Sequence, residues 1–109
     1  MNLVSFGKAG ESLAAAFLEK NGYWISERNY RCRAGEIDLI AEKDHVLHFI
    51  EVKTRSSDRY GSPAEAVTET KQQHLRKAAA FYLKERKPEE DFYSFDVIEI
   101  SLRHLKGVM

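Results

Sequence analysis

Hydrophobic residues recur at helical spacing in two parts of the chain. Positions 5–21 carry one apolar stripe, and Gly22 follows as a helix end. Positions 69–86 carry a second stripe, which the pair Lys87-Pro88 ends. The sequence therefore predicts two helices, each with one apolar side. Their apolar residues are Phe6, Ala9, Leu13, Ala16 and Phe17 in the first and Leu75, Ala78, Ala79, Tyr82 and Leu83 in the second.

Between and after these helices the pattern changes to alternation and short apolar runs, which are typical of strands. The expected strands are positions 23–28, 35–41, 46–54 and 92–102. The polar turn 42–45 joins the second and third strands into a hairpin, and the last strand is either continuous or broken near Ser94. After a polar loop, Pro63 starts a helical turn that ends at Val67. The resulting order, α-β-β-β-α-β, predicts an α/β fold.

Charged residues interrupt the hairpin, where burial makes a charge costly unless it is paired. Asp38 lies in the first arm, and Glu51 and Lys53 lie in the second. Side chains alternate across a strand, so Glu36 shares a face with Asp38, and Glu51 shares one with Lys53. If the matching faces of the two arms meet, the acids and the lysine converge.

The alternative interpretation is an exposed ion pair. In that case Glu51 and Lys53 lie on the outer face of an amphipathic strand, and Asp38 is solvated. An outer face should be polar throughout. The face of Glu51 instead continues through Phe49, and that of Asp38 continues through Ile40. The charges therefore lie at the end of an apolar surface, and this favours a functional site over an exposed ion pair.

The chemistry of the cluster suits Mg²⁺ or Mn²⁺, hard cations that prefer oxygen ligands and retain water. We expect Asp38 and Glu51 to be ligands, and the carbonyl of Val52 to provide a third oxygen. Lys53 would then orient an attacking water or stabilise charge on a phosphate. The acids favour its charged form, whereas burial and a bound cation favour its neutral form.

These motifs closely resemble the YraN-like family of small bacterial proteins. That family is similar to the PD-(D/E)xK nucleases, which include Holliday-junction resolvases and type II restriction enzymes. The resemblance extends over nearly the whole chain and implies a restriction-endonuclease-like fold, with three layers and a mixed β-sheet. The matching elements are Gly10-Glu11, Ala14-Ala15, Gly35-Glu36-Ile37-Asp38-Leu39-Ile40, Phe49-Ile50-Glu51-Val52-Lys53-Thr54-Arg55, Gly61-Ser62-Pro63, Lys71 and Phe95-Asp96-Val97.

The resemblance implies that Asp38 and Glu51 bind metal and that Lys53 assists the chemistry. In resolvase-like relatives an acid of the first helix reaches the same metal, and Glu11 matches it here. Glu11 is equally well explained as an ordinary acid of a first helical turn, which the helix dipole favours. Glu36 is either a supporting acid or a neighbour that adds negative charge.

Positive charge is unevenly distributed along a chain whose 17 basic and 17 acidic residues balance. Bases outnumber acids from Lys53 to Lys87, and acids dominate from there to Glu99. The basic middle either holds a phosphate backbone or is merely solvated. Arginines also crowd the expected loop 28–33, where they are placed to clamp phosphates. The predicted nucleic-acid contacts are Arg31, Arg33, Arg55 and Lys71.

Length and composition set the scale of the prediction. With 109 residues, 43% of them hydrophobic, the chain predicts a single domain spanning residues 1–109. No apolar run reaches the length of a membrane span, and no signal-peptide pattern is seen, so we expect a cytoplasmic protein that does not bind membrane. The single Cys32 fits a reducing compartment.

The sequence therefore predicts a metal-dependent endonuclease that hydrolyses phosphodiester bonds. DNA is favoured over RNA as the substrate, and branched DNA rests on analogy with the resolvases. By the same analogy a two-fold homodimer is expected. The alternative is an adaptor that binds nucleic acid and keeps the nuclease fold with little catalysis. The neutral net charge supports it, and the intact set of acids and lysine opposes it.

Overall fold

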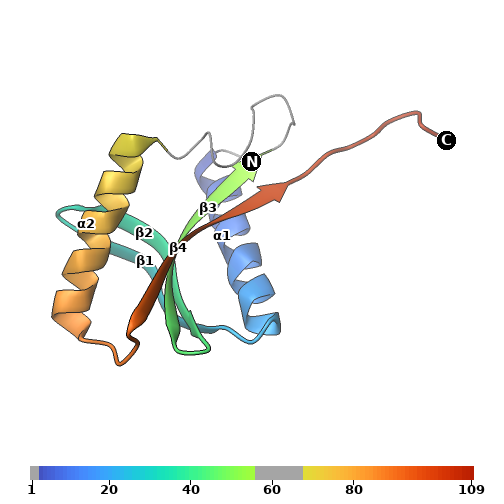
Figure 1. Cartoon of the computed structure of the whole chain (residues 1–109). Helices are drawn as coiled ribbons and strands as arrows, with labels where there is room; N and C mark the ends of the chain where they lie inside the picture. Colours follow the sequence, from blue (N-terminus) through green and yellow to red (C-terminus); the bar gives the residue numbers. More distant parts are fainter. Residues whose placement is uncertain (1–2, 56–67) are drawn as a thin grey trace.

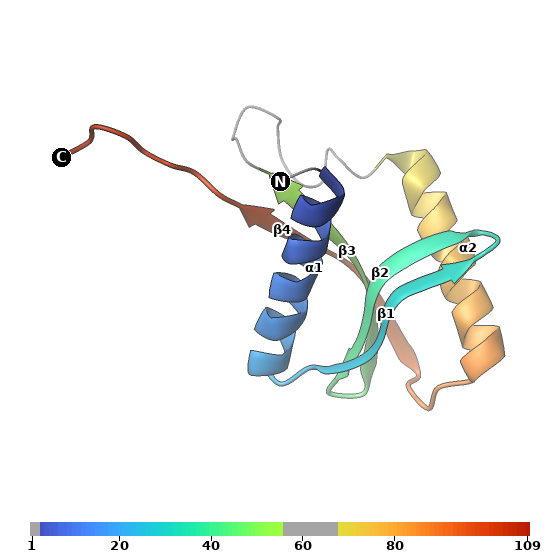
Figure 2. The same cartoon turned by 180° about the vertical axis from the view of Figure 1, so that it is seen from behind.

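The computed structural model describes residues 3–55 and 68–109 of the chain. Within these ranges the elements are α1 (Leu3–Lys20), β1 (Trp24–Cys32), β2 (Gly35–Lys43), β3 (Val46–Arg55), α2 (Glu69–Arg86) and β4 (Phe92–Ser101). The helices lie on opposite faces of the sheet, so that the fold has three layers (Figures 1 and 2). The predicted α/β class, element order and restriction-endonuclease-like architecture are confirmed.

The sheet has four strands in the order β1-β2-β3-β4 within the described residues. β1 and β3 run antiparallel to β2, and β4 runs parallel to β3. Asp44 and His45 join β2 to β3, both with positive φ, as a tight hairpin turn requires. The parallel pair needs a longer crossover, and α2 lies on the path between β3 and β4. The sheet is therefore mixed, as predicted.

The first strand is longer than its sequence pattern indicates. The expected loop 28–33 is wrong, because β1 continues to Cys32 and pairs with β2 through Arg28 opposite Leu39 and Tyr30 opposite Ile37. Tyr30 is buried against α2, while its charged neighbours remain exposed. Polar side chains do not prevent a strand at a sheet edge, because the backbone alone completes the ladder.

The last strand and the second helix agree closely with their predictions. β4 runs unbroken through Ser94, which is paired with His48 of β3. α2 has the predicted bounds and is capped by Thr68, whose hydroxyl accepts a hydrogen bond from the Lys71 N–H. The helical turn predicted at 63–67 lies outside the described residues. The core under α2 comprises Tyr30, Ile37, Ile40, Leu47, Phe49, Leu75, Ala78, Ala79 and Tyr82.

The first helix packs through a different face from the predicted one. Its buried residues are Gly10, Ala14, Ala15 and Leu18, whereas Ala9, Leu13, Ala16 and Phe17 are exposed. The expected stripe is therefore wrong for these positions, and the side chain of Phe6 lies outside the described part. Small residues occupy the buried face because they let the helix lie close to the sheet. A Cβ atom added at Gly10 would be 1.9 Å from Cγ2 of Thr54 in β3.

None of the described helices combines the length and apolarity needed to cross a lipid bilayer. The chain after β4 extends away from the body of the fold (Figure 1). Its residues, 102–109, are exposed.

Candidate active site

The hairpin of β2 and β3 places Asp38 and Glu51 side by side. The ladder pairs Leu39 with Ile50, and the two acids are the next residues on either strand. Oδ2 of Asp38 accepts a hydrogen bond of 2.8 Å from the N–H of Val52. Both carboxylates line a pocket with Lys71, His74 and Leu75 of α2, so they lie on the sheet face that this helix covers. The predicted convergence of these acids is present.

Glu51 lies at the centre of a charged cluster. Glu51 is only 7% exposed. One carboxylate oxygen, Oε1, is 3.4 Å from Nζ of Lys53 and 2.5 Å from Nζ of Lys71. Lys53 reaches it along the same strand, and Lys71 reaches it from the first turn of α2. The cluster therefore contains two lysines where the hairpin motif indicated one.

Sequence reasoning assigned Lys71 to phosphate binding and missed its contact with Glu51. A weak signal was available. The amino-terminal turn of a helix disfavours a positive charge, so Lys71 three residues after its N-cap lies where a cation needs a nearby acid. Sequence alone does not identify that acid, because the helix and the hairpin are distant along the chain.

The two lysines differ in their affinity for protons. The ammonium of Lys71 lowers the pKa of Lys53, and burial lowers it further, although Glu51 acts in the opposite direction. Burial is the largest single effect on the pKa of Lys71 and acts to lower it, but the hydrogen bonds with Glu51 and Lys53 and the charges of Glu51 and Asp38 together outweigh burial and raise that pKa. Lys71 is therefore firmly held as a cation, while Lys53 releases its proton more readily than an ordinary lysine.

Asp38 carries the strongest electrostatic mark of the cluster. Its pKa is raised from the ordinary 3.8 to about 7, and burial is the largest cause. The hydrogen bond from the Val52 N–H opposes this rise, and the negative charges of Glu51, Glu11 and Glu36 contribute to it. Acids from β2, β3 and α1 are therefore close enough to act on one another.

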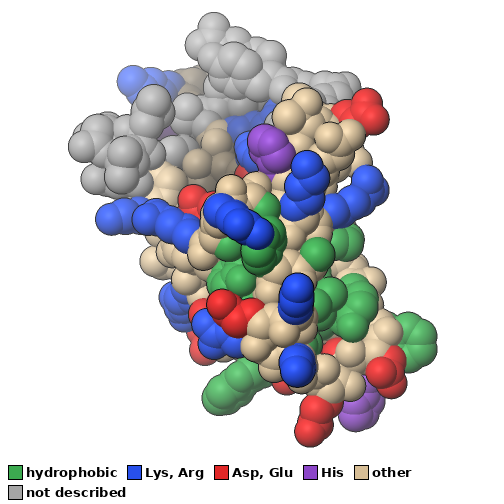
Figure 3. All heavy atoms as spheres, turned by 90° about the vertical axis from the view of Figure 1, so that its left-hand side faces the viewer, with side chains coloured by type: hydrophobic (Ala, Val, Ile, Leu, Met, Phe, Trp, Pro, Cys, Tyr) green, Lys and Arg blue, Asp and Glu red, His purple; other side chains and the backbone are tan. Residues whose placement is uncertain are grey.

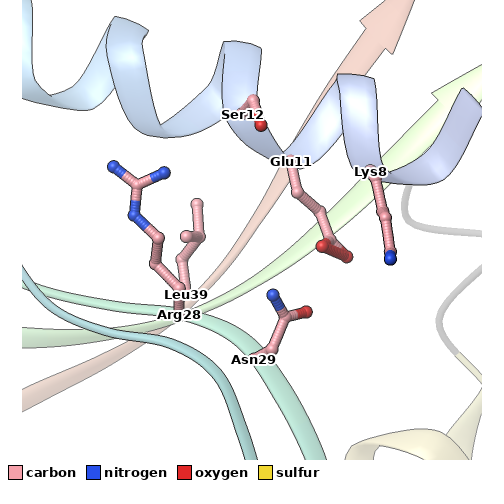
Figure 4. A pocket seen from close by; sticks show the side chains of 6 residues that line it. All are labelled: Lys8, Glu11, Ser12, Arg28, Asn29 and Leu39. Carbon is pink, nitrogen blue, oxygen red and sulfur yellow. The ribbon is translucent and has the colours of Figure 1, made fainter. Parts of the chain in front are cut away.

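Asn29 of β1 connects Glu11 of α1 with Glu36 of β2. Figure 4 shows the carboxylate of Glu11 pointing from α1 toward the amide of Asn29, with Lys8 alongside it. In the amide orientation that satisfies its neighbours, the Asn29 nitrogen lies 3.0 Å from Oε1 of Glu11 and 3.1 Å from Oε1 of Glu36. Asn29 itself has a φ of 53°, which breaks the regular strand. No feature of the sequence indicated this bridge.

The donor set suits a hard cation, since it consists of carboxylate oxygens with an excess of negative charge around Asp38. Within the described residues, however, no three of these acids come close enough to form a complete metal site. Asp38 and Glu51 are the residues that would hold the ion, with Glu11 as the nearest further donor. The contact made by Val52 is its N–H to Asp38. The role predicted for its carbonyl stays a prediction.

The predicted phosphate-binding arginines fall into two groups. Arg31 and Arg33 are exposed beside the turn from β1 to β2; Arg31 is 3.6 Å from Glu36, and Arg33 lies over the ring of Phe81. The side chain of Arg55 is only 10% exposed, and its Nε is 2.8 Å from Oε1 of Glu99. Arg31 and Arg33 thus lie at the surface, whereas Arg55 joins β3 to β4.

Comparison with known proteins places these features in a family. The model of the uncharacterised protein family UPF0102 matches residues 10–100. The chain belongs to this family. The YraN-like resemblance drawn from the motifs is therefore confirmed. The UPF0102 match spans every acid and lysine of the cluster, from Glu11 to Lys71.

Bacterial relatives with the same family name are similar along most of their length. A UPF0102 protein of Caldicellulosiruptor saccharolyticus is 45% identical over 100 residues, covering 92% of this chain and 85% of the relative. One from Clostridium perfringens is 52% identical over 97 residues, with coverages of 89% and 80%. One from Syntrophomonas wolfei is 53% identical over 94 residues, with coverages of 86% and 82%. Their names state a family and no activity.

Proposed function

We propose that this UPF0102 protein is a metal-dependent endonuclease that hydrolyses DNA phosphodiester bonds. The observation that carries the proposal is the pairing of Asp38 with Glu51 across the hairpin, on a face where two lysines also converge. Burying a charged cluster at the end of an apolar surface costs desolvation free energy, which a functional role for the cluster would explain. The restriction-endonuclease-like fold agrees with this activity but does not establish it.

In this proposal Asp38 and Glu51 hold Mg²⁺ or Mn²⁺, and Glu11 is a further candidate ligand. The bound ion would polarise the phosphate and lower the pKa of a water molecule. Lys53, with its lowered pKa, is suited to positioning that water and handling its proton. Lys71 stays charged and is suited to stabilising the negative charge that develops on the phosphate.

The surface around the cluster supports binding of a polyanion. Lys and Arg side chains are spread over the face that α2 presents (Figure 3). These exposed bases include Arg76, Lys77, Lys84 and Arg86. Arg31 and Arg33 extend the basic surface from the β1–β2 turn next to Glu36. We infer DNA as the substrate class, with branched DNA as the form suggested by the resolvases.

One observation favours a second candidate, an adaptor that binds nucleic acid without cutting it. Glu51 is already neutralised by Lys71 at 2.5 Å and by Lys53 at 3.4 Å. If these ion pairs persist in the presence of metal, the carboxylate would serve the structure of the domain and not catalysis. The two candidates differ in one measurable property, which is cleavage.

The test is a cleavage assay with Mg²⁺ or Mn²⁺ on linear duplex, branched and single-stranded nucleic acids. We expect wild-type protein to cut, and Lys53→Met and Lys71→Met to lose activity by about two to three powers of ten, as expected when a preorganised charge is removed. Lys20→Met is the matched control, because it removes an exposed lysine from the last turn of α1 that belongs neither to the cluster nor to the basic surface. Protein that binds these nucleic acids and metal yet cuts none of them would support the adaptor.

A further inference from the structure

The two edges of the sheet differ in their protection against pairing with another strand. The edge formed by β1 is irregular: its register shifts between Ile25 and Glu27, and Asn29 has a positive φ. It also exposes the charged side chains of Arg28 and Arg31. Bulges and charges of this kind prevent one sheet edge from joining another. The β1 edge is therefore protected.

The edge formed by β4 has no bulge, and its two charged residues, Asp96 and Glu99, are each paired with a side chain of β3. Ten consecutive residues, Phe92–Ser101, pair with β3 in an unbroken register. They include no proline, glycine, lysine or arginine. Within the described ranges, no strand pairs with the other side of β4. A long, regular edge of this kind presents unpaired N–H and C=O groups that can accept another strand.

Apolar side chains flank this open edge on both faces of the sheet. On the α2 face, Tyr93, Phe95 and Val97 remain 38% to 49% exposed, and Figure 3 shows hydrophobic side chains grouped beside α2. On the α1 face, a pocket is lined mainly by Leu13 and Phe17 of the helix and by Ile98 and Ile100 of β4. Leu13 and Phe17 are each 58% exposed, and with Ile98 and Ile100 they form one contiguous apolar patch.

We propose that two copies of this chain pair through β4, antiparallel about a two-fold axis, with α1 of one copy packing against α1 of the other. The two β4 strands would form the centre of a continuous eight-stranded sheet. Leu13, Phe17 and Ile98 would be buried on one face, and Phe95 and Val97 would be covered by the second copy on the other. One contact then explains the regular edge and both apolar flanks.

The charges around β4 favour a second copy of the chain over an unrelated partner. Acidic residues precede the strand at Glu89, Glu90 and Asp91, and basic residues follow it at Arg103 and Lys106. An antiparallel arrangement brings the acidic end of one copy to the basic end of the other. With the axis at Val97, for example, Asp91 lies opposite Arg103 of the second copy. A parallel arrangement would place acid beside acid.

The symmetry also has a consequence that rests on the proposed nuclease function. A two-fold axis perpendicular to the sheet turns the same face of each copy to the same side. Glu51 is next to Val97 in the parallel register, so both clusters would open near the axis. Three strand spacings of about 4.8 Å separate the two β3 strands, or roughly 14 Å. Two sites at that separation would be presented to one duplex.

Association is tested by sedimentation equilibrium and light scattering over a micromolar concentration series. We expect wild-type protein to reach twice the monomer mass. Leu13→Lys and Phe17→Lys should each weaken dimerisation by about tenfold or more, since each places a charge in an apolar contact. Trp24→Lys is the matched control, because Trp24 is an apolar residue on the protected β1 edge that is even more exposed than Leu13 and Phe17. Circular dichroism shows whether each variant is folded.

A charge exchange tests the antiparallel arrangement directly. One variant carries Glu89→Lys and Asp91→Lys, and the other carries Arg103→Glu and Lys106→Glu. Each alone would oppose like charges and should associate weakly, whereas an equal mixture should form a heterodimer that weakens as salt rises.

Wild-type protein that stays monomeric at every concentration would overturn the proposal, as would a mixture no tighter than its components. If Phe95→Ala lowers nucleic-acid binding in a monomeric protein, the face serves nucleic acid and the dimer is wrong. None of these mass measurements depends on cleavage, so failure of the nuclease assignment leaves the test of the dimer intact.

Discussion

Replacing Asp38 with asparagine should change how stability depends on pH. Burial and nearby acids raise the pKa of Asp38 from 3.8 to about 7. A difference of one pH unit in pKa corresponds to about 1.4 kcal/mol, so this rise corresponds to about 4 kcal/mol at full weight. Because the residue is partly exposed, solvent screening reduces the expected effect to about 2 kcal/mol.

The sign follows from the number of protons that each state binds. Between about pH 4 and pH 7 the folded protein keeps the Asp38 proton and the unfolded chain releases it. The contribution of this group to the free energy of unfolding is therefore fully present below about pH 4 and is lost as the pH rises to about 7. Asparagine cannot titrate, yet its side-chain oxygen can still accept the hydrogen bond from Val52.

The assay is urea denaturation at a series of pH values without divalent metal, comparing wild-type protein with Asp38→Asn. The variant should gain about 2 kcal/mol relative to wild type between pH 4 and pH 7. Asp44→Asn is the control, since Asp44 is an exposed turn aspartate with a positive φ that asparagine tolerates. Parallel stability curves for wild type and Asp38→Asn would show that the pKa of Asp38 is not raised in the folded protein.

Three further predictions test packing, metal binding and nucleic-acid binding. Gly10→Ala should lower the free energy of unfolding by roughly 1 to 3 kcal/mol, because the added Cβ meets β3. Gly7→Ala, whose added Cβ meets no neighbouring atom, should instead raise it by about 0.5 to 1 kcal/mol. Thermal or urea unfolding measures both changes. Mg²⁺ or Mn²⁺ should stabilise wild type by about 2.7 kcal/mol at a hundredfold excess over its dissociation constant, and Glu51→Gln should lose this gain; equal gains would remove Glu51 from the metal site. Arg31→Ala and Arg33→Ala should each reduce the slope of log affinity against log salt by about one in DNA-binding titrations; unchanged slopes would place the basic surface elsewhere.

The hairpin cluster could be predicted because its geometry is local. Alternation of side chains and the short turn between β2 and β3 determine which residues face one another, and the apolar residues show which face is covered. Asp38, Glu51 and Lys53 follow from these rules alone. The order of the elements was likewise predictable, since apolar residues recur at different spacings in helices and in strands.

Features that depend on distant packing could not be predicted in this way. Lys71 reaches Glu51 only because α2 covers β2, and Asn29 reaches Glu11 only because α1 covers the other face. The buried face of α1 was predicted wrongly because hydrophobicity favours Leu13 and Phe17, whereas close packing selects small residues. The charged residues around position 30 likewise led to the prediction of a loop, although β1 continues there through hydrogen bonds of the backbone alone.

The cluster draws its residues from elements that differ in how they open. Asp38 and Glu51 lie on the two inner strands, which are paired on both sides and should exchange their amide protons only when the whole domain unfolds. Glu11 and Lys71 come from the two helices, so their place in the cluster depends on the packing of each helix against the sheet. Brief detachment of α2 would leave Glu51 without its closest cation, and detachment of α1 would remove one acid from the field around Asp38. The pKa values of the cluster therefore depend on whether both helices are packed against the sheet.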